Sequence, residues 1–158
     1  MKLQTLIKTG ALGALCLAAI PALAVAGACP ADKTGVDLRK PDSHAAKGVT
    51  DTVLTSIDVA KEPIAIPGRL FRLRRLVIQP GGVVPWHSHG ERPAIIYILS
   101  GQVTEYASTC SVPIVHPAGD ATPELHTTAH WWRNTGKGVA VILAADLFPV
   151  ASPDSHMM

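Results

Sequence analysis

Two histidines separated by one residue are the first feature of this sequence that could do chemistry. The segment His87-Ser88-His89 lies among residues that favour β-strands. Because side chains two apart on a strand project from the same face, both imidazoles can reach a single ion. Imidazole nitrogens are common ligands of transition metals. A lone pair of this kind is a weak signal, so its surroundings decide how it is interpreted.

Glycines lie at regular distances on both sides of the pair. Five residues separate Gly81 from His87, and eleven separate His89 from Gly101. The sequence between them is rich in Ile, Val and Tyr, which suit a pleated and half-buried strand. The histidine pair therefore belongs to a longer strand-turn pattern.

A second run contains one more histidine. Ten residues separate Gly119 from His130, and three more precede Asn134. Together the two runs resemble the two characteristic motifs of the cupin superfamily, in the family's order and at unaltered spacing. The family's proline and glycine positions in the second motif are Leu125 and Thr127 here. The resemblance covers about residues 66 to 149.

The resemblance implies an all-β fold, a single-domain cupin with a jelly-roll β-barrel. It also implies one divalent transition-metal ion bound by His87, His89 and His130. Three neutral imidazoles suit Fe, Mn, Zn, Ni or Cu, so the ligand type does not name the metal. A homodimer is expected by resemblance only.

One departure from the family pattern affects the metal site. The family's glutamate ligand corresponds to position 94, which is Ala94, and the shorter spacing gives Pro93. Neither side chain binds metal. The fourth position is either open to water or filled from a neighbouring loop, and three residues are candidates for that ligand or for an acid/base: Glu91, Glu124 and His126. An open site is one charge more positive, which favours an anionic ligand.

The rest of the sequence predicts short strands separated by turns. Turn residues such as Pro80-Gly81-Gly82 and Ser100-Gly101 divide them, and no helical period exceeds a turn. Many short strands at this spacing are typical of a sandwich or barrel. The predicted strands are Thr52–Val59, Leu70–Gln79, Ala94–Leu99, Gln102–Ala107, Pro113–His116, Ala129–Asn134 and Val139–Phe148.

Alternation along these strands predicts what lines the cavity. If the metal ligands point inward, four further side chains do so as well, and Trp131 points away. The basic segment 69–75 is interpreted as a solvated outer face, with a cavity arginine as the alternative. Arg92 is the better candidate for an arginine at the cavity mouth, while His44, His116 and His156 are interpreted as ordinary histidines. The predicted lining residues are Ile96, Ile98, Trp132 and Asn134.

The N-terminus has the features of a cleaved secretory signal. Lys2 and Lys8 precede an apolar run that ends in small residues, which predicts a signal peptide over residues 1–28. An arm (29–50), a cupin barrel (51–150) and a C-terminal tail (151–158) follow. Losing the two lysines leaves twelve basic and twelve acidic side chains, so neither nucleic acid nor a membrane is an expected partner after cleavage.

Export also determines how the cysteines are interpreted. Cys16 lies in the signal, which leaves Cys29 and Cys110 as an even pair in an oxidising compartment, periplasmic or extracellular. This favours a disulfide between them. The alternative is two free thiols, one of them a metal ligand.

Two classes of function fit these features. The first is a metalloenzyme acting on a small organic acid, and the second is a non-catalytic module that binds a metal or a small ligand. Fold analogy does not choose between them. A small-molecule ligand is expected in either case, because an apolar cavity with a few imidazoles suits one.

Overall fold

A computed structural model describes residues 27–150. The predicted signal peptide, apart from its last two residues, lies outside the described residues, and so does the C-terminal tail with His156. Within the described part of the chain, no helix is long and apolar enough to cross a membrane.

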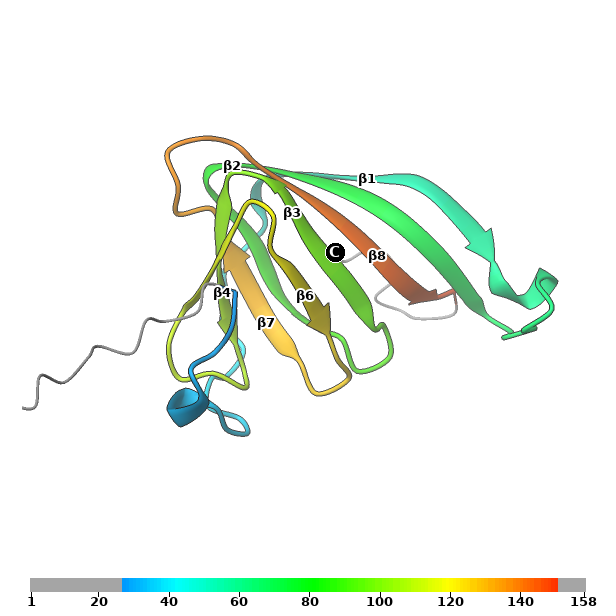
Figure 1. Ribbon diagram of the computed structural model, residues 1–158, viewed down its shortest axis with the longest axis horizontal. Coiled ribbons are helices and arrows are strands. Elements are labelled where there is room, and N and C mark those ends of the chain that lie inside the picture. Colours follow the sequence, from blue (N-terminus) through cyan, green and yellow to red (C-terminus); the bar gives the residue numbers. More distant parts are fainter. Residues whose placement is uncertain (1–26, 151–158) are drawn as a thin grey trace, which may run out of the picture.

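Eight antiparallel strands form one curved sheet, a half-barrel (Figure 1). The hydrogen-bonded order is β5-β4-β7-β2-β8-β3-β6, and β1 pairs with the free side of β2. Two short 3-10 helices, η1 (Ala31–Lys33) and η2 (Val59–Lys61), lie outside the sheet. The strands are β1 (Lys47–Asp58), β2 (Arg69–Ser88), β3 (Ala94–Ser100), β4 (Gln102–Ala107), β5 (Ile114–Pro117), β6 (Ala121–Glu124), β7 (Ala129–Arg133) and β8 (Ala140–Pro149).

The longest strand, β2, links the two parts of the half-barrel. Its first half pairs with β8 and β1, and its second half pairs with β7. The change of partner occurs around Gly81, which has a φ of 73°, a conformation that glycine adopts without steric cost. Gly82 lies so close to the backbone that an added Cβ would sit 2.8 Å from the carbonyl oxygen of Gln79. The predicted turn at this place is therefore a bend within one strand.

The inner face of the sheet carries the hydrophobic core. Burial alternates along β8 from Ala140 onward, as expected for a strand with one face packed and one face toward water. β3 shows the same alternation from Ala94 to Ile98. The main buried cluster contains Leu76, Ile78, Val84, Ala94, Ile96, Ile98, Val103, Trp132, Ala140, Ile142 and Ala144.

The all-β prediction is confirmed, while three details differ. The strand order has two ends, β5 and β6, so the described residues form a half-barrel instead of the closed barrel that was predicted. β6 was missed because it is only four residues long and contains Pro123, which an edge strand tolerates. β1 begins at Lys47, five residues before the predicted start.

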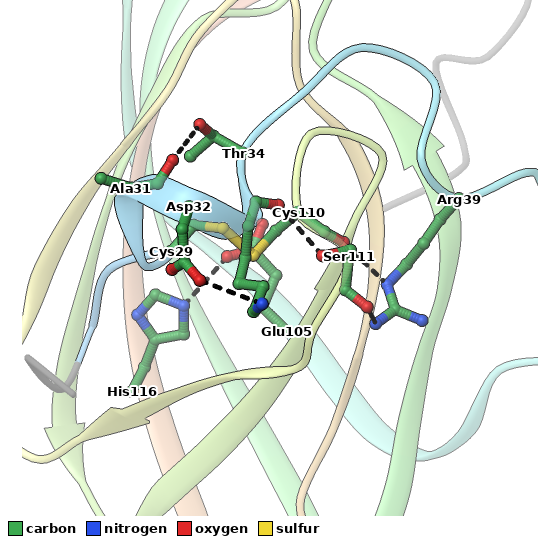
Figure 2. Close-up of a disulfide and its surroundings, with 10 residues drawn as sticks. Cys29, Ala31, Asp32, Thr34, Arg39, Glu105, Cys110, Ser111 and His116 are labelled. Atoms are coloured by element: carbon green, nitrogen blue, oxygen red, sulfur yellow. Dashed lines mark hydrogen bonds and ion pairs between the residues drawn. A yellow bond between two sulfur atoms is a disulfide. The ribbon is translucent and has the colours of Figure 1, made fainter. Parts of the chain in front are cut away.

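The Cys29–Cys110 disulfide is present and joins the N-terminal segment to the loop after β4 (Figure 2). Its Cα atoms are 5.9 Å apart. Around it, the amide of Leu38 donates to the carbonyl of Ser108, and the guanidinium of Arg39 donates to the carbonyl of Cys110. The covalent bond is thus reinforced by backbone pairing along the segment that it tethers.

Replacing both cysteines by serine should lower the free energy of unfolding of the mature protein by about 4 kcal/mol, since the bond closes a long loop in the unfolded chain. The sequence separation is 81 residues. Urea titration of both proteins measures the difference. Alkylation of both cysteines without prior reduction would show that the bond does not form.

Candidate metal centre

Three imidazole rings from two adjacent strands meet at one point. His87 lies on β2 directly opposite His130 on β7, and His89 follows just after the end of β2. The Nε2 atom of His130 is 3.1 Å from Nε2 of His87 and 3.2 Å from Nε2 of His89. His89 and His130 are each 1% exposed, while His87 is partly buried. Together they form one of two groups within the described residues that could hold a metal ion.

An extra residue in β2 brings these rings to the inner face. Val84 pairs with Trp132 and His87 pairs with His130, so β2 advances three residues while β7 advances two. Side chains an odd number apart on a regular strand face opposite sides, yet Val84 and His87 line the same cavity. The bulge therefore turns the side chains of His87 and His89 toward the inner face of the sheet.

The second nitrogen of each ring is held by a hydrogen-bond acceptor. Nδ1 of His87 is 2.9 Å from the carbonyl oxygen of Pro85, and Nδ1 of His89 is 2.9 Å from that of Arg92. Nδ1 of His130 is 2.5 Å from Oε1 of Glu105. Because carbonyl and carboxylate oxygens only accept, each Nδ1 carries the proton, and each Nε2 of the neutral ring presents a lone pair to the centre.

The environment keeps His87 and His89 neutral. Burial, followed by the proximity of His130, lowers the pKa of His87 well below its ordinary value and that of His89 to about 3. The guanidinium of Arg92 contributes in the same direction at both. At neutral pH these rings are therefore available as ligands.

Glu105 is a residue of the site that sequence reasoning missed. Burial alone raises its pKa, but hydrogen bonds from His116 and His130 lower the pKa of this carboxyl to about 2, so it is ionised. Its neighbours two positions away, Val103 and Ala107, are buried on the inner face. That alternation was visible in the sequence and could have indicated an inward carboxylate.

Glu124 lies next to Ala94, the position of the family's glutamate ligand, but on the side of the His130 ring that faces away from the histidine cluster. On β6 it pairs directly with Ala94. Its Oε2 atom is 3.6 Å from Nδ1 of His130, the nitrogen that faces away from the histidine cluster, and its buried Oε1 has no hydrogen-bond partner. Burial raises the pKa of Glu124 to about 7, with His130 opposing the shift. Glu124 belongs to the second candidate group, with Glu105 and His130.

The other two candidates for a fourth ligand lie at the surface. Glu91 and His126 are exposed and line a shallow hollow together with Arg69. Neither residue belongs to the histidine cluster or to the group around Glu105.

The predicted cavity is present, with two of its four predicted lining residues. Ile96 and Trp132 line it, whereas Ile98 lies in the core beyond it. Asn134 is buried, and its side-chain amide donates to the carbonyls of Ile78 and Gly138. The cavity volume is about 30 Å³. This is room for a metal ion with one or two ligands the size of water.

An arginine on the cavity wall corrects the interpretation of the basic segment. Arg74 lines the cavity and is 6% exposed, so this residue does not belong to a solvated outer face. It forms ion pairs with Asp51 on β1 and Asp146 on β8. Arg72 binds the same Asp146 through two hydrogen bonds of 2.7 and 2.9 Å. Arg92 is also buried, with its Nη1 4.0 Å from Asp146.

Comparison with known proteins agrees with this geometry. Residues 74–146 match the family model described as a cupin domain. A search of curated proteins found no match. We assign this segment, which contains all three histidines, to the cupin superfamily, as the motif resemblance implied.

Three solved structures resemble the fold. A predicted oxalate decarboxylase from Thermotoga maritima has a TM-score of 0.52 and 23% identity, over 63% of this chain and 80% of its own. The cupin domain of Schizosaccharomyces pombe Cnp3 has a TM-score of 0.51 and 13% identity, over 64% of this chain and 65% of its own. The cupin domain of an XRE-family transcriptional regulator from Enterobacter cloacae has a TM-score of 0.51 and 10% identity, over 65% of this chain and 99% of its own. At these identities the similarity shows the fold alone.

Replacing Glu124 by Gln should change how stability depends on pH in the metal-free protein. The folded-state pKa of about 7 lies above the ordinary value of 4.5, so the wild type loses stability as pH rises from 4.5 toward 7. Glutamine, which mimics the protonated acid, avoids this loss. The variant should gain up to about 3 kcal/mol relative to wild type between pH 5 and pH 8.

Urea unfolding at both pH values measures this change. The exposed Glu91→Gln serves as the matched control, which should follow the wild type. An identical difference between Glu124→Gln and wild type at pH 5 and pH 8 would contradict the prediction.

Proposed function

We propose that this protein binds one divalent transition-metal ion through the Nε2 atoms of His87, His89 and His130. The observation that carries the proposal is the geometry of the rings: each Nδ1 lies within hydrogen-bond distance of an acceptor, which implies that Nδ1 carries the proton and that the Nε2 lone pairs converge. Nε2 of His130 is 3.1 Å from Nε2 of His87 and 3.2 Å from Nε2 of His89, so the lone pairs of these nitrogens repel one another. A cation between them removes that repulsion and uses all three as ligands.

The spacing of the rings also fits an ion. Two nitrogens that are each about 2.0–2.1 Å from a shared metal lie about 2.8–3.0 Å apart in octahedral geometry and about 3.3–3.4 Å apart in tetrahedral geometry. The Nε2 separations of 3.1 and 3.2 Å lie between these two sets of values. Three imidazoles suit Fe, Mn, Zn, Ni or Cu, and a metal there would act as a Lewis acid toward a bound ligand.

We further propose that the ligand of this site is a small organic acid. The buried Arg74 lines the same cavity as the histidines, and its guanidinium pairs with Asp51 and Asp146. Apolar side chains, among them Ile96 and Ile142, form much of the remaining wall. A carboxylate that binds the metal would therefore have a cation nearby in a site of low polarity, where charge interactions are strong. The small volume restricts the ligand to a few atoms.

Both predicted classes of function use this site. A metalloenzyme would convert the acid, whereas a binding module would only hold it. Oxygen consumption and product analysis with a panel of small acids, performed on the metal-loaded protein, separate the two.

Export and self-association stay predictions. The Cys29–Cys110 bridge supports an oxidising compartment, periplasmic or extracellular. The outer face of the sheet exposes Phe71, Ile95 and Tyr97, which is compatible with a homodimer. Size-exclusion chromatography with light scattering measures the oligomeric state.

Single replacement of any of the three histidines by alanine should lower metal occupancy by at least tenfold, because each removes one of the protein ligands. Elemental analysis of protein purified from its exported location gives both the identity and the amount of metal. His126→Ala is the matched control, since His126 is exposed and away from the cluster, and it should retain the metal. Occupancy that survives all three cluster variants would place the metal elsewhere.

Oxalate should raise the melting temperature of the metal-loaded protein and leave that of the metal-stripped protein unchanged. Oxalate is a suitable probe because it is a small dianion with metal-binding oxygens; the Thermotoga maritima neighbour is described as a predicted oxalate decarboxylase. Differential scanning calorimetry measures the shift. Oxamide, its neutral analogue, is the control. Equal shifts for the loaded and stripped proteins would show that the anion does not bind at the metal.

A further inference from the structure

A chain of three polar side chains leads from the histidine cluster toward the surface. Oε1 of Glu105 is 2.5 Å from Nδ1 of His130, and Oε2 is 3.0 Å from Nε2 of His116. Nδ1 of His116 is in turn 2.6 Å from Oδ2 of Asp120. The chain begins behind a proposed metal ligand and ends at a side chain that is 19% exposed.

Building on the proposed metal site, we propose that Glu105, His116 and Asp120 form its outer shell. In this role they hold His130 in one tautomer and orientation, and they supply the negative charge that the family's ligand glutamate would have supplied at Ala94. They act through His130 and are therefore positioning residues.

The hydrogen-bond inventory fixes the charge of this outer shell. Both nitrogens of His116 face carboxylate oxygens, which accept and do not donate, so both carry protons and the ring is an imidazolium. Two carboxylates and one imidazolium give one net negative charge. That is the charge of the missing ligand carboxylate, moved from the metal's first shell to the far side of the His130 ring.

Packing holds the outer shell rigidly. His116 is fully buried and stacks on Trp132, with ring centroids 4.8 Å apart and planes at 19°. The indole N–H of Trp132 contacts the His130 ring, with its nitrogen 2.9 Å from Nδ1 and 3.2 Å from Nε2, and the two rings are nearly perpendicular at 88°. Glu105 and His116 lie beside the Cys29–Cys110 bridge (Figure 2). Gly27 lies against Asp120, because a Cβ added at Gly27 would be 2.2 Å from the carboxylate of Asp120. The N-terminal segment therefore packs on Asp120, the outermost of the three side chains.

This arrangement has a chemical consequence. A carboxylate ligand occupies a coordination position, whereas a carboxylate behind an imidazole does not. The outer shell raises the basicity of His130 and offsets part of the metal's charge while leaving a position for the small acid.

Cobalt(II) binding to the full mature chain tests the assignment. Glu105→Gln keeps the size of the side chain and removes its charge, so the dissociation constant for Co²⁺ should rise by about 10- to 100-fold. The visible absorption bands of bound Co²⁺ should also shift, because they report the ligand field at the metal. A side chain that merely supports the fold would change the melting temperature without shifting these bands.

Asp120→Asn provides a second variant at a partly exposed position, and it decides the question if Glu105→Gln does not fold. Its effect should be a several-fold loss of affinity, since it acts through two intervening groups. Glu91→Gln is the control and should bind like wild type. Unchanged affinity and spectrum in both test variants would overturn the outer-shell assignment, whereas a wild type that binds no Co²⁺ would overturn the metal site itself.

Discussion

The convergence of three imidazole lone pairs is the constraint on which the rest of this structure depends. Such an arrangement is costly, because polar atoms buried next to one another must either be paired or repel. The protein places an acceptor at each opposite nitrogen: two backbone carbonyls and one carboxylate. Each ring is thereby prevented from rotating or changing tautomer, so the cluster is built before any ion arrives.

The charges around this cluster are divided between its two sides. On one side, Arg74 lines the cavity and pairs with Asp146 and Asp51. On the other side, two carboxyl groups lie behind the His130 ring: Glu105 is ionised, and the pKa of Glu124 is raised to about 7. A ligand in the cavity therefore lies near Arg74, while the charge of the proposed metal is offset from the far side of the His130 ring.

Much of the scaffold could be predicted from sequence, because local patterns report it. Alternating apolar residues indicated β3 and β8, and the spacing of glycines and histidines indicated the family. The disulfide followed from counting cysteines. Each of these signals lies within a short stretch or a simple count, so no knowledge of the neighbours in space was needed.

The polar interior was beyond such patterns. Arg74 lies in a segment dense in charge, and only its pairing with Asp51 and Asp146 from two other strands makes burial tolerable. His116 was interpreted as an ordinary histidine because its partners, Glu105 and Asp120, are brought to it by strand pairing and a turn. A residue whose role is defined by partners far along the chain carries little local signal.

The bulge between Val84 and His87 affects how the spacing between Gly81 and the histidine pair relates to the direction of the rings. If the extra residue were lost together with the bulge, Val84 and the first histidine would be two residues apart on a regular strand and would still face the same side. A related chain with one residue fewer before the pair would therefore keep both rings on the inner face without a bulge. The number of residues and the regularity of the strand must match: an odd separation needs a bulge to keep both side chains on one face, and an even separation needs none.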